Sequence, residues 1–338
     1  MKVLIIKLSS IGDCVQTLPA LYALRKGFGK KGIKARIDWL VEEAASSILK
    51  DNQMLDNLIV VKRGWAGNLK ENLKAARSLA SEHYDIVIDF QGLLKSAVWV
   101  MLSGGKRRIG FRNGRELSHL FLNEKLPAFD LEMHAVDRYL SLAKYLGGLT
   151  GEAVFPIDTG KESSGLKKKL KESGIKNGSP FFVMVTRARW ATKLWTDRKF
   201  VEAARRIIDK TGMQAVLAGG ASDSAALDKI RDEIGHGSVN LAGRTDLKEL
   251  AALFKMASFV ITVDSGPMHM ASAVGAKTVA LFGPTAPWRT GPYGKGHIII
   301  RKGVACSPCF KKRCGEPKCM EGITVEEVVE GALKITGK

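Results

Sequence analysis

The sequence opens on Val3-Leu4-Ile5-Ile6-Lys7-Leu8-Ser9-Ser10-Ile11-Gly12-Asp13, an apolar run that passes into a turn of small and polar residues. The run predicts a buried strand over 3–7. The apolar residues that follow at helical spacing predict a helix over 11–24. A strand that enters a helix through a short turn is the start of a βαβ unit. This stretch therefore indicates a parallel α/β sheet whose first ligand-facing loop follows that strand.

The same alternation continues along both halves of the chain. Further strands are expected at 35–41, 57–61, 85–89, 181–186, 214–218, 239–241, 259–263 and 278–282, and helices at 69–82, 197–211, 222–234, 247–256, 267–274 and 324–335. A glycine-rich stretch at 147–180 interrupts the alternation and reads as a linker with one amphipathic helix. We therefore expect an α/β protein of two doubly wound, Rossmann-like domains.

Composition narrows the function classes. The chain has 338 residues, of which 45% are hydrophobic and 26% charged, which excludes a disordered or collagen-like protein and favours two domains. Its apolar runs are too short for a membrane-spanning helix, and its first residues lack a secretory signal, so we expect a cytoplasmic protein. The net charge of +19 favours a polyanionic partner such as nucleic acid, anionic lipid or a phosphorylated substrate.

Three loops that follow strands carry candidate chemistry. In the first, Asp13 is either a helix cap or a cleft-facing carboxylate that takes a proton from a hydroxyl. In the second, 186–195, three cations precede a helix; Lys193 and Thr192 suit a diphosphate, and the alternative is a solvated basic loop.

The third loop, Val263-Asp264-Ser265-Gly266-Pro267-Met268-His269, is a strand end that runs into a helix. Its amides form a natural anion site, and Asp264 could accept sugar hydroxyls. His269 is either part of this site or an ordinary core histidine. The chain contains no Walker loop, Gly-x-Gly-x-x-Gly fingerprint, Gly-x-Ser-x-Gly elbow or His-Glu-x-x-His motif. The sequence therefore disfavours an ATPase, a dehydrogenase, a hydrolase and a zinc protease.

Several segments together resemble the lipopolysaccharide heptosyltransferases, type I most closely. The segments are the opening 3–13 with Thr17-Leu18-Pro19-Ala20, Asp38–Glu43, Asp89–Ser96, Arg115-Glu116, His134–Arg138, Trp190–Trp195, Leu241–Thr245, Val263–His269 and Gly283-Pro284-Thr285. The similarity runs from about residue 1 to 330. It implies the GT-B fold, with two Rossmann-like domains facing a cleft: an acceptor-binding domain over 1–160, a donor-binding domain over 161–322, and a C-terminal helix, 323–338, that packs back on the first domain.

The resemblance also implies a reaction. A member of this family transfers heptose from ADP-L-glycero-D-manno-heptose to the Kdo-lipid A inner core with inversion, needs no metal cofactor and releases ADP. Asp13 matches the general base and Lys193 the cation on the donor diphosphate. Other donor-side positions are Thr192, Asp223, Asp264, Ser265, Gly266 and His269. Acceptor-side candidates are Ser10, Gly12, Lys62, Arg63, Arg115, His134 and Arg138. A lipid acceptor implies peripheral contact with the anionic cytoplasmic face of the inner membrane.

One feature lies outside this scheme. Cys306, Cys309, Cys314 and Cys319 are spaced tightly enough to hold a structural metal, to form a disulfide, or to pack a loop as reduced thiols. None of these cysteines has a catalytic role in the expected reaction, for which no metal is assigned.

Alternative functions remain open at this point. One is a type II heptosyltransferase, and another is a different nucleotide-sugar transferase or an epimerase of the same fold. A third is a nucleic-acid-binding protein, which the charge allows but no recognition motif supports. Binding of ADP-sugars against UDP-sugars, or salt-sensitive binding of DNA, would discriminate these possibilities.

Overall fold

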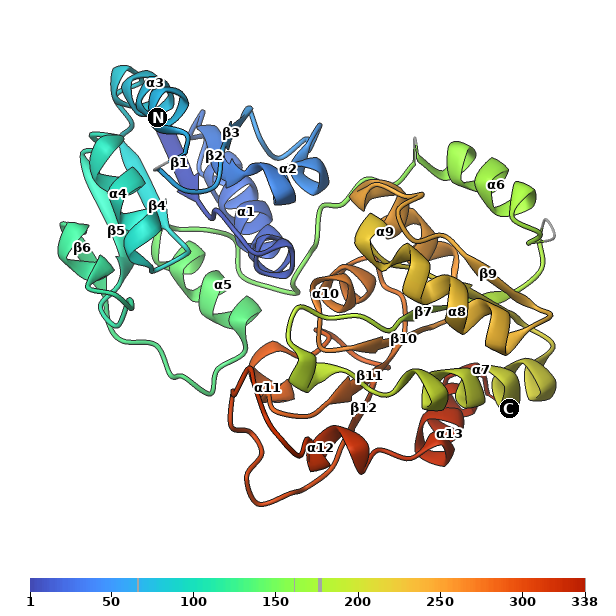
Figure 1. The fold of residues 1–338 in the computed structure, drawn as a ribbon. Helices are drawn as coiled ribbons and strands as arrows, with labels where there is room; N and C mark the ends of the chain where they lie inside the picture. The colour runs from blue at the N-terminus through green and yellow to red at the C-terminus, as the bar shows by residue number, and fades with distance from the viewer. Residues whose placement is uncertain (66, 161, 176–177, 338) are drawn as a thin grey trace. The chain divides into compact units, whose positions relative to one another are not determined.

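The computed structural model describes residues 1–65, 67–160, 162–175 and 178–337, and it divides the chain into two compact units. The first unit is Met1–Ile157 and the second is Asp158–Lys338, a division close to the expected domain boundary at 160. Each unit is a parallel sheet with helices on its faces (Figure 1).

The first unit contains a six-stranded sheet in the order β3-β2-β1-β4-β5-β6 among its described residues. Its strands are β1 Lys2–Ile6, β2 Arg36–Glu42, β3 Asn57–Val61, β4 Ile86–Asp89, β5 Arg107–Phe111 and β6 Glu124–Leu126. The apolar residues of β1 are fully buried, as expected for a central parallel strand that is covered on both faces. The strand order reverses between β1 and β4, which makes the ends of these two strands the switch point of the sheet.

Helices connect these strands. They are α1 Ile11–Lys30, α2 Glu43–Leu49, α3 Leu69–Ser81, α4 Leu94–Leu102, the short 3-10 helix η1 Ser118–Phe121, and α5 Ala135–Tyr145. Helix α5 packs along α1, which brings its side chains to the turn that follows β1. The sequence predicted α1 and α3 but not α4 or β5, both of which border the candidate site.

The second unit repeats the topology. Its strands are β7 Phe181–Val185, β8 Gln214–Leu217, β9 Ser238–Asn240, β10 Val260–Val263, β11 Thr278–Phe282 and β12 Ile298–Arg301, in the order β12-β11-β10-β7-β8-β9. Its helices are α6 Glu162–Glu172, η2 Ala191–Lys193, α7 Asp197–Thr211, η3 Ala221–Asp223, α8 Ser224–Ile234, α9 Leu247–Met256, α10 Gly266–Ala273, α11 Pro287–Thr290, α12 Lys318–Glu321 and α13 Val325–Thr336. Here the switch point lies between β7 and β10. The two units therefore share one doubly wound topology.

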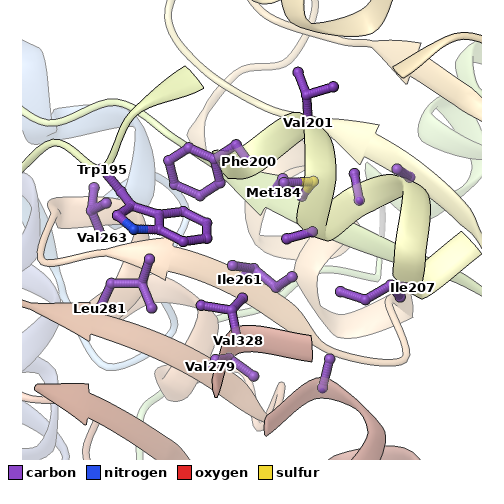
Figure 2. Close-up of a cluster of buried hydrophobic side chains, with 14 of the residues drawn as sticks. Met184, Trp195, Phe200, Val201, Ile207, Ile261, Val263, Val279, Leu281 and Val328 are labelled. Carbon is purple, nitrogen blue, oxygen red and sulfur yellow. The ribbon is translucent and has the colours of Figure 1, made fainter. Parts of the chain in front are cut away.

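A continuous apolar core holds the second unit together. Figure 2 shows side chains from β7, β10, β11, α7 and α13 meeting around Trp195 and Phe200. The rings of Trp195 and Phe200 meet edge to face at 4.9 Å, and the indole Nε1 donates to the carbonyl of Ile323 at 3.1 Å. Burial of this indole fixes the end of the 186–195 loop and so positions the residues before it.

The C-terminal helix belongs to the core of the second unit. Helix α13 packs against α7, β11 and β12 of the second unit, and Val325, Val328, Val329 and Ala332 belong to that unit's core. Ion pairs from Glu326 to Arg206 and from Glu327 to Lys302 join it to the same unit. The apolar face of α13 is therefore covered by its own unit. No helix in the described part of the chain is long and apolar enough to span a bilayer.

Candidate active site

One candidate site lies in the first unit, in the turn between β1 and α1 and in the first turn of α1. Ser10 is the N-cap of α1, and both its backbone N and its Oγ donate to Oδ2 of Asp13, at 2.9 and 2.8 Å. Asp13 is therefore a capping residue, as one of the two sequence hypotheses held. Its side chain is nevertheless 41% exposed, and Oδ1 lies 3.7 Å from the Nζ of Lys7. Asp13 therefore caps the helix while its side chain stays partly exposed, where a substrate hydroxyl can reach it.

Lys7 is a buried cation beneath this carboxylate. Its Nζ donates to the hydroxyl of Tyr139 at 2.7 Å and to the carbonyl of Phe90 at 3.1 Å. Burial by itself would lower the pKa of Lys7, but the neighbouring Tyr139 and Asp13 outweigh burial and raise it. Lys7 therefore remains charged at neutral pH and provides a fixed positive charge next to Asp13.

Residues after β4 complete this candidate site of the first unit. Gln91 accepts from the backbone N of Ser9 at 3.2 Å through Oε1. Lys95, on α4, donates to Ser9 Oγ at 2.6 Å and to Oε1 of Glu42 at 2.8 Å. Asp89 is buried and accepts from the backbone N of Gln91 at 2.9 Å, and burial raises its pKa. The ends of β1 and β4 thus carry one connected polar network around Ser9–Asp13.

The acceptor-side candidates fall into two groups. Ser10 is the N-cap of α1 and Gly12 lies in its first turn, and Arg138 stacks on Tyr139, the partner of Lys7, at 5.3 Å. His134 caps α5, with Nδ1 accepting from the backbone N of Val136 at 3.1 Å, and the backbone N of Arg115 donates to the carbonyl of Gly92 at 2.9 Å.

Lys62 and Arg63 differ from the other acceptor-side candidates. They follow β3, the edge strand two positions from β1, and Lys62 lies 3.8 Å from Glu71. In the described residues, no recorded contact joins either of these cations to the Asp13 turn.

A second candidate site lies in the second unit, at the ends of β7 and β10. The Nζ of Lys193 lies 2.6 Å from Oδ2 of Asp264, and these side chains are 16% and 5% exposed. Thr285 donates to the same oxygen of Asp264 at 2.6 Å. This buried ion pair at the switch point joins two of the predicted donor-side residues.

An aromatic ring and a second lysine adjoin Lys193. The ammonium groups of Lys193 and Lys312 lie 4.6 and 5.5 Å from the centre of the Trp190 ring. Thr192 donates to the carbonyl of Lys311 at 2.8 Å. The loop that contains Lys311 and Lys312 is therefore attached to the candidate diphosphate site.

Helix α10 begins beside Asp264. Ser265 is its N-cap, Gly266 is its first residue, and the hydroxyls of Thr262 and Ser265 lie 3.5 Å apart. His269 is half-buried one turn into the helix, and its carbonyl accepts from Ser272. The helix N-terminus adds amide donors to the charge of Lys193.

Asp223 is the last residue of η3, which follows β8, the strand next to β7. Its Oδ2 accepts from the backbone N of Gly220 at 2.9 Å. Its charge contributes to the raised pKa of Arg187, whose main cause is a two-pronged bond to Asp197. Asp223 therefore lies in the neighbourhood of the 186–195 loop but outside the Lys193–Asp264 pair.

The cysteines are free thiols in the structure. Cys14 is buried behind Asp13, and burial raises its pKa to about 12, which makes it unreactive. The described residues hold no group of three or more His, Cys, Asp or Glu side chains placed to bind a metal ion. The loop with the other four is fixed instead by backbone contacts, such as Cys309 N to the carbonyl of Pro284 at 3.0 Å.

Several residues near Asp13 and Lys193 were not identified as functional from the sequence. They are Lys7, Glu42, Gln91, Lys95, Tyr139, Trp190, Thr285 and Lys312. Lys7 offered a signal, because a lysine at the end of an apolar strand needs a buried partner. The partner, Tyr139, is 132 positions away in the chain, and nothing local in the sequence links the two.

Comparisons with known proteins show which family the chain resembles. Residues 72–320 match the family model described as glycosyltransferase family 9 (heptosyltransferase). The chain is 30% identical to lipopolysaccharide heptosyltransferase 1 of Pseudomonas aeruginosa, over 93% of this chain and 87% of the relative. It is 31% identical to the protein of the same name from Salmonella typhimurium, over 91% of this chain and 95% of the relative.

The fold of this chain is also similar to that of a solved heptosyltransferase structure. The structure titled E. coli heptosyltransferase WaaC with ADP superposes with a TM-score of 0.79 at 25% identity, covering 99% of this chain and 100% of that one. The two six-stranded units are accordingly the two Rossmann-like domains of the GT-B architecture. The chain belongs to glycosyltransferase family 9, the heptosyltransferases.

Proposed function

We propose that the protein transfers L-glycero-D-manno-heptose from ADP-L-glycero-D-manno-heptose to Kdo-lipid A, with inversion at the anomeric carbon, in lipopolysaccharide biosynthesis. Family membership supports the glycosyl transfer, and the names of the curated relatives support a type I heptosyltransferase. The relative solved with ADP supports an ADP-activated donor.

The observation that carries the proposal is the placement of charge at both switch points. In the first unit an accessible carboxylate, Asp13, follows β1. In the second unit a buried cation, Lys193, follows β7 and pairs with Asp264 after β10. Ligands of open parallel sheets bind outside the carboxyl ends of the strands at these points. A base and a diphosphate-binding cation are the two groups that this reaction needs.

The acceptor half supplies the base. Asp13 takes the proton of the acceptor hydroxyl as its oxygen attacks the anomeric carbon. The Ser10 bonds hold the carboxylate in one orientation, and Lys7 keeps a positive charge beside it. We assign Ser10, Gly12, Arg115, His134 and Arg138 to the acceptor side, together with Lys62 and Arg63.

The donor half stabilises the leaving group. As the bond between the anomeric carbon and the diphosphate oxygen breaks, the electron pair leaves with ADP, and Lys193 and the amides at the start of α10 neutralise the developing charge. Asp264 and Thr285 hold Lys193 in place. We assign Thr192, Asp223, Ser265, Gly266 and His269 to the same donor, with Asp223 toward the ribose, and we propose that no metal cofactor is required.

The acceptor also determines where the enzyme works. Kdo-lipid A is anchored in a membrane, and a protein with a net charge of +19 is attracted to anionic lipid. We therefore propose that the protein acts at the cytoplasmic face of the inner membrane as a peripheral protein, with no nucleic-acid partner.

Mass spectrometry tests the proposal. The full chain is incubated with ADP-heptose and Kdo2-lipid A, and the acceptor should gain the mass of one heptose while ADP is released. A parallel arm offers an acceptor that already carries the first heptose. Heptose added only to that acceptor would replace type I with type II specificity, and heptose added to neither would overturn the proposal.

A further inference from the structure

Helix α4 exposes apolar side chains next to the acceptor half of the site. Leu94 and Met101 are 46% and 58% exposed, and their spacing of seven residues places them on one face of the helix. The opposite face is buried, with Trp99 and Val100 in the core. A surface helix normally presents polar side chains to water. Helix α4 differs, because the side chains that it exposes include the apolar Leu94 and Met101.

The short helix η1 extends this surface. Leu117, the N-cap residue of η1, and Leu120, inside η1, are 64% and 62% exposed. Helix η1 packs against α4, and the backbone N of Leu94 donates to Oε2 of Glu116 at 3.1 Å. Leu94, Met101 and Leu120 are therefore exposed on two helices that pack together, Leu117 is exposed directly before the second of them, and we call these four residues the apolar patch.

Two arginines lie near the apolar patch, in the segment that leads into η1. Arg112 and Arg115 are exposed in the segment between β5 and η1, and the backbone N of Arg115 bonds to Gly92, just before α4. Lys106 and Arg107 lie at the other end of β5 and are paired with Asp85 and Glu124. The arginines nearest the patch thus have no recorded acidic partner among the described residues.

The same helix connects the patch to the site. Lys95 follows Leu94 directly and reaches Ser9 Oγ at 2.6 Å, in the turn that contains Asp13. Helix α4 therefore directs its first lysine toward the acceptor turn and its neighbouring leucine toward solvent.

We propose that the apolar patch docks on an anionic lipid bilayer, with its leucines and methionine in the boundary between headgroups and acyl chains and with Arg112 and Arg115 on the lipid phosphates. The proposal rests on the proposed function for its biological meaning, since a lipid-anchored acceptor would then meet Asp13 at the bilayer surface. Exposed apolar side chains rimmed by cations are what an interfacial membrane site requires.

Charge favours a bilayer over a second copy of the chain as the occupant. A protein of net charge +19 repels its own copies, whereas anionic lipid attracts each nearby cation.

Vesicle flotation of the full chain, without substrates, tests the proposal. We expect the protein to float with vesicles of phosphatidylethanolamine and phosphatidylglycerol, and not with vesicles of phosphatidylcholine alone. The double variant Leu117→Ser with Leu120→Ser should bind the anionic vesicles at least about tenfold more weakly, because two leucines lose their apolar burial. Its transfer rate to a water-soluble acceptor fragment should equal that of the wild type, since neither leucine touches the polar network.

A matched control replaces two exposed apolar residues elsewhere in the same unit, Val60→Ser with Leu149→Ser, and should bind vesicles like the wild type. Equal binding by all three proteins, or no binding by the wild type, would overturn the proposal. The proposal would also be overturned if the wild type were a dimer and the Leu117→Ser, Leu120→Ser variant a monomer, because a second copy would then be the occupant of the patch. The outcome is independent of the transfer assay, so vesicle binding can fail while heptose transfer succeeds, and the reverse.

Discussion

At the scale of single residues, Asp13 combines a structural and a chemical role. Its Oδ2 completes the capping box of α1, while its exposed carboxylate is the proposed base. An alanine at this position would remove both functions at once, because loss of a cap costs about 1 kcal/mol. An asparagine keeps an acceptor oxygen for Ser10 and removes only the basic group.

We therefore expect Asp13→Asn to lower kcat by about 10² to 10⁴, which is the usual contribution of a general base. ADP affinity should not change, because the proposed nucleotide contacts belong to the second unit. Steady-state kinetics and calorimetric titration with ADP measure the two quantities, and a melting curve checks that the cap survives. A kcat within twofold of the wild type would remove Asp13 from the mechanism.

His297 is a second residue whose environment makes a prediction. Its Nδ1 lies 3.1 Å from Thr278 Oγ1 and its Nε2 lies 3.2 Å from the carbonyl of Tyr293, so the neutral ring is satisfied on both sides. Burial lowers the pKa of His297 below its ordinary value of 6.5. Below about pH 6.5 the unfolded chain takes up a proton more readily than the folded protein, so stability decreases as the pH falls.

Melting temperatures at about pH 7.5 and about pH 5.5 test this. The wild type should lose more stability over this interval than His297→Gln, whose amide does not titrate. Carboxylates with a lowered pKa, such as Glu82, lose their contribution at lower pH. His236→Gln, at an exposed histidine, is the matched control and should behave like the wild type. The same loss in all three proteins would show that another group titrates.

At the scale of elements, the sequence predicted the strands whose apolar runs are short and bounded by polar turns. The strand at 57–61 is confirmed in full, and β1 is displaced by only one residue from its expected range. Helix α4 was missed because Leu94–Leu102 is apolar on both its buried and its exposed faces, which leaves no periodic signal. Strand β5 was missed because it begins with two arginines.

The candidate site was predictable where its residues follow strands and unpredictable where it depends on contacts distant in sequence. Asp264 and Lys193 stood out because each lies in a polar loop after an apolar strand. That the two form one ion pair follows from the pairing of β7 with β10, which spacing along the chain does not reveal. Residue types thus indicate the chemistry, and the sheet order determines which of them meet.

The cysteine-containing loop gives the prediction at this scale. It places Lys312 over the Trp190 ring that Lys193 also contacts, so we expect Lys312 to add positive charge at the donor diphosphate. Lys312→Ala should weaken ADP binding about fivefold, or about 1 kcal/mol, as fits an exposed cation. Binding of adenosine should not change, because it has no phosphate. Calorimetric titration measures both affinities.

Arg313→Ala is the matched control, since it removes an exposed cation from the same loop. We expect it to bind ADP like the wild type, whereas Lys193→Ala should have a larger effect than Lys312→Ala because Lys193 is buried beside Asp264. If Lys312→Ala and Arg313→Ala weaken ADP binding equally, the loop acts through its overall charge and Lys312 has no specific role.

At the scale of the whole molecule, the chain consists of two units that each have a complete parallel sheet and a core of their own. In the proposed mechanism the base belongs to one unit and the donor contacts to the other. We therefore expect the second unit alone to bind the nucleotide but not to catalyse transfer. Each unit should also fold without the other.

We expect residues 158–338, produced alone, to unfold cooperatively and to bind ADP with an affinity close to that of the full chain. They should transfer no heptose, because Asp13 is absent. Residues 158–323, which lack α13, should not fold, since Val325, Val328 and Val329 would leave the core open. Circular dichroism melting and calorimetric titration distinguish these fragments. A folded 158–338 fragment that failed to bind ADP would mean that the nucleotide also depends on residues of the first unit, and the assignment of the donor contacts to the second unit alone would be wrong.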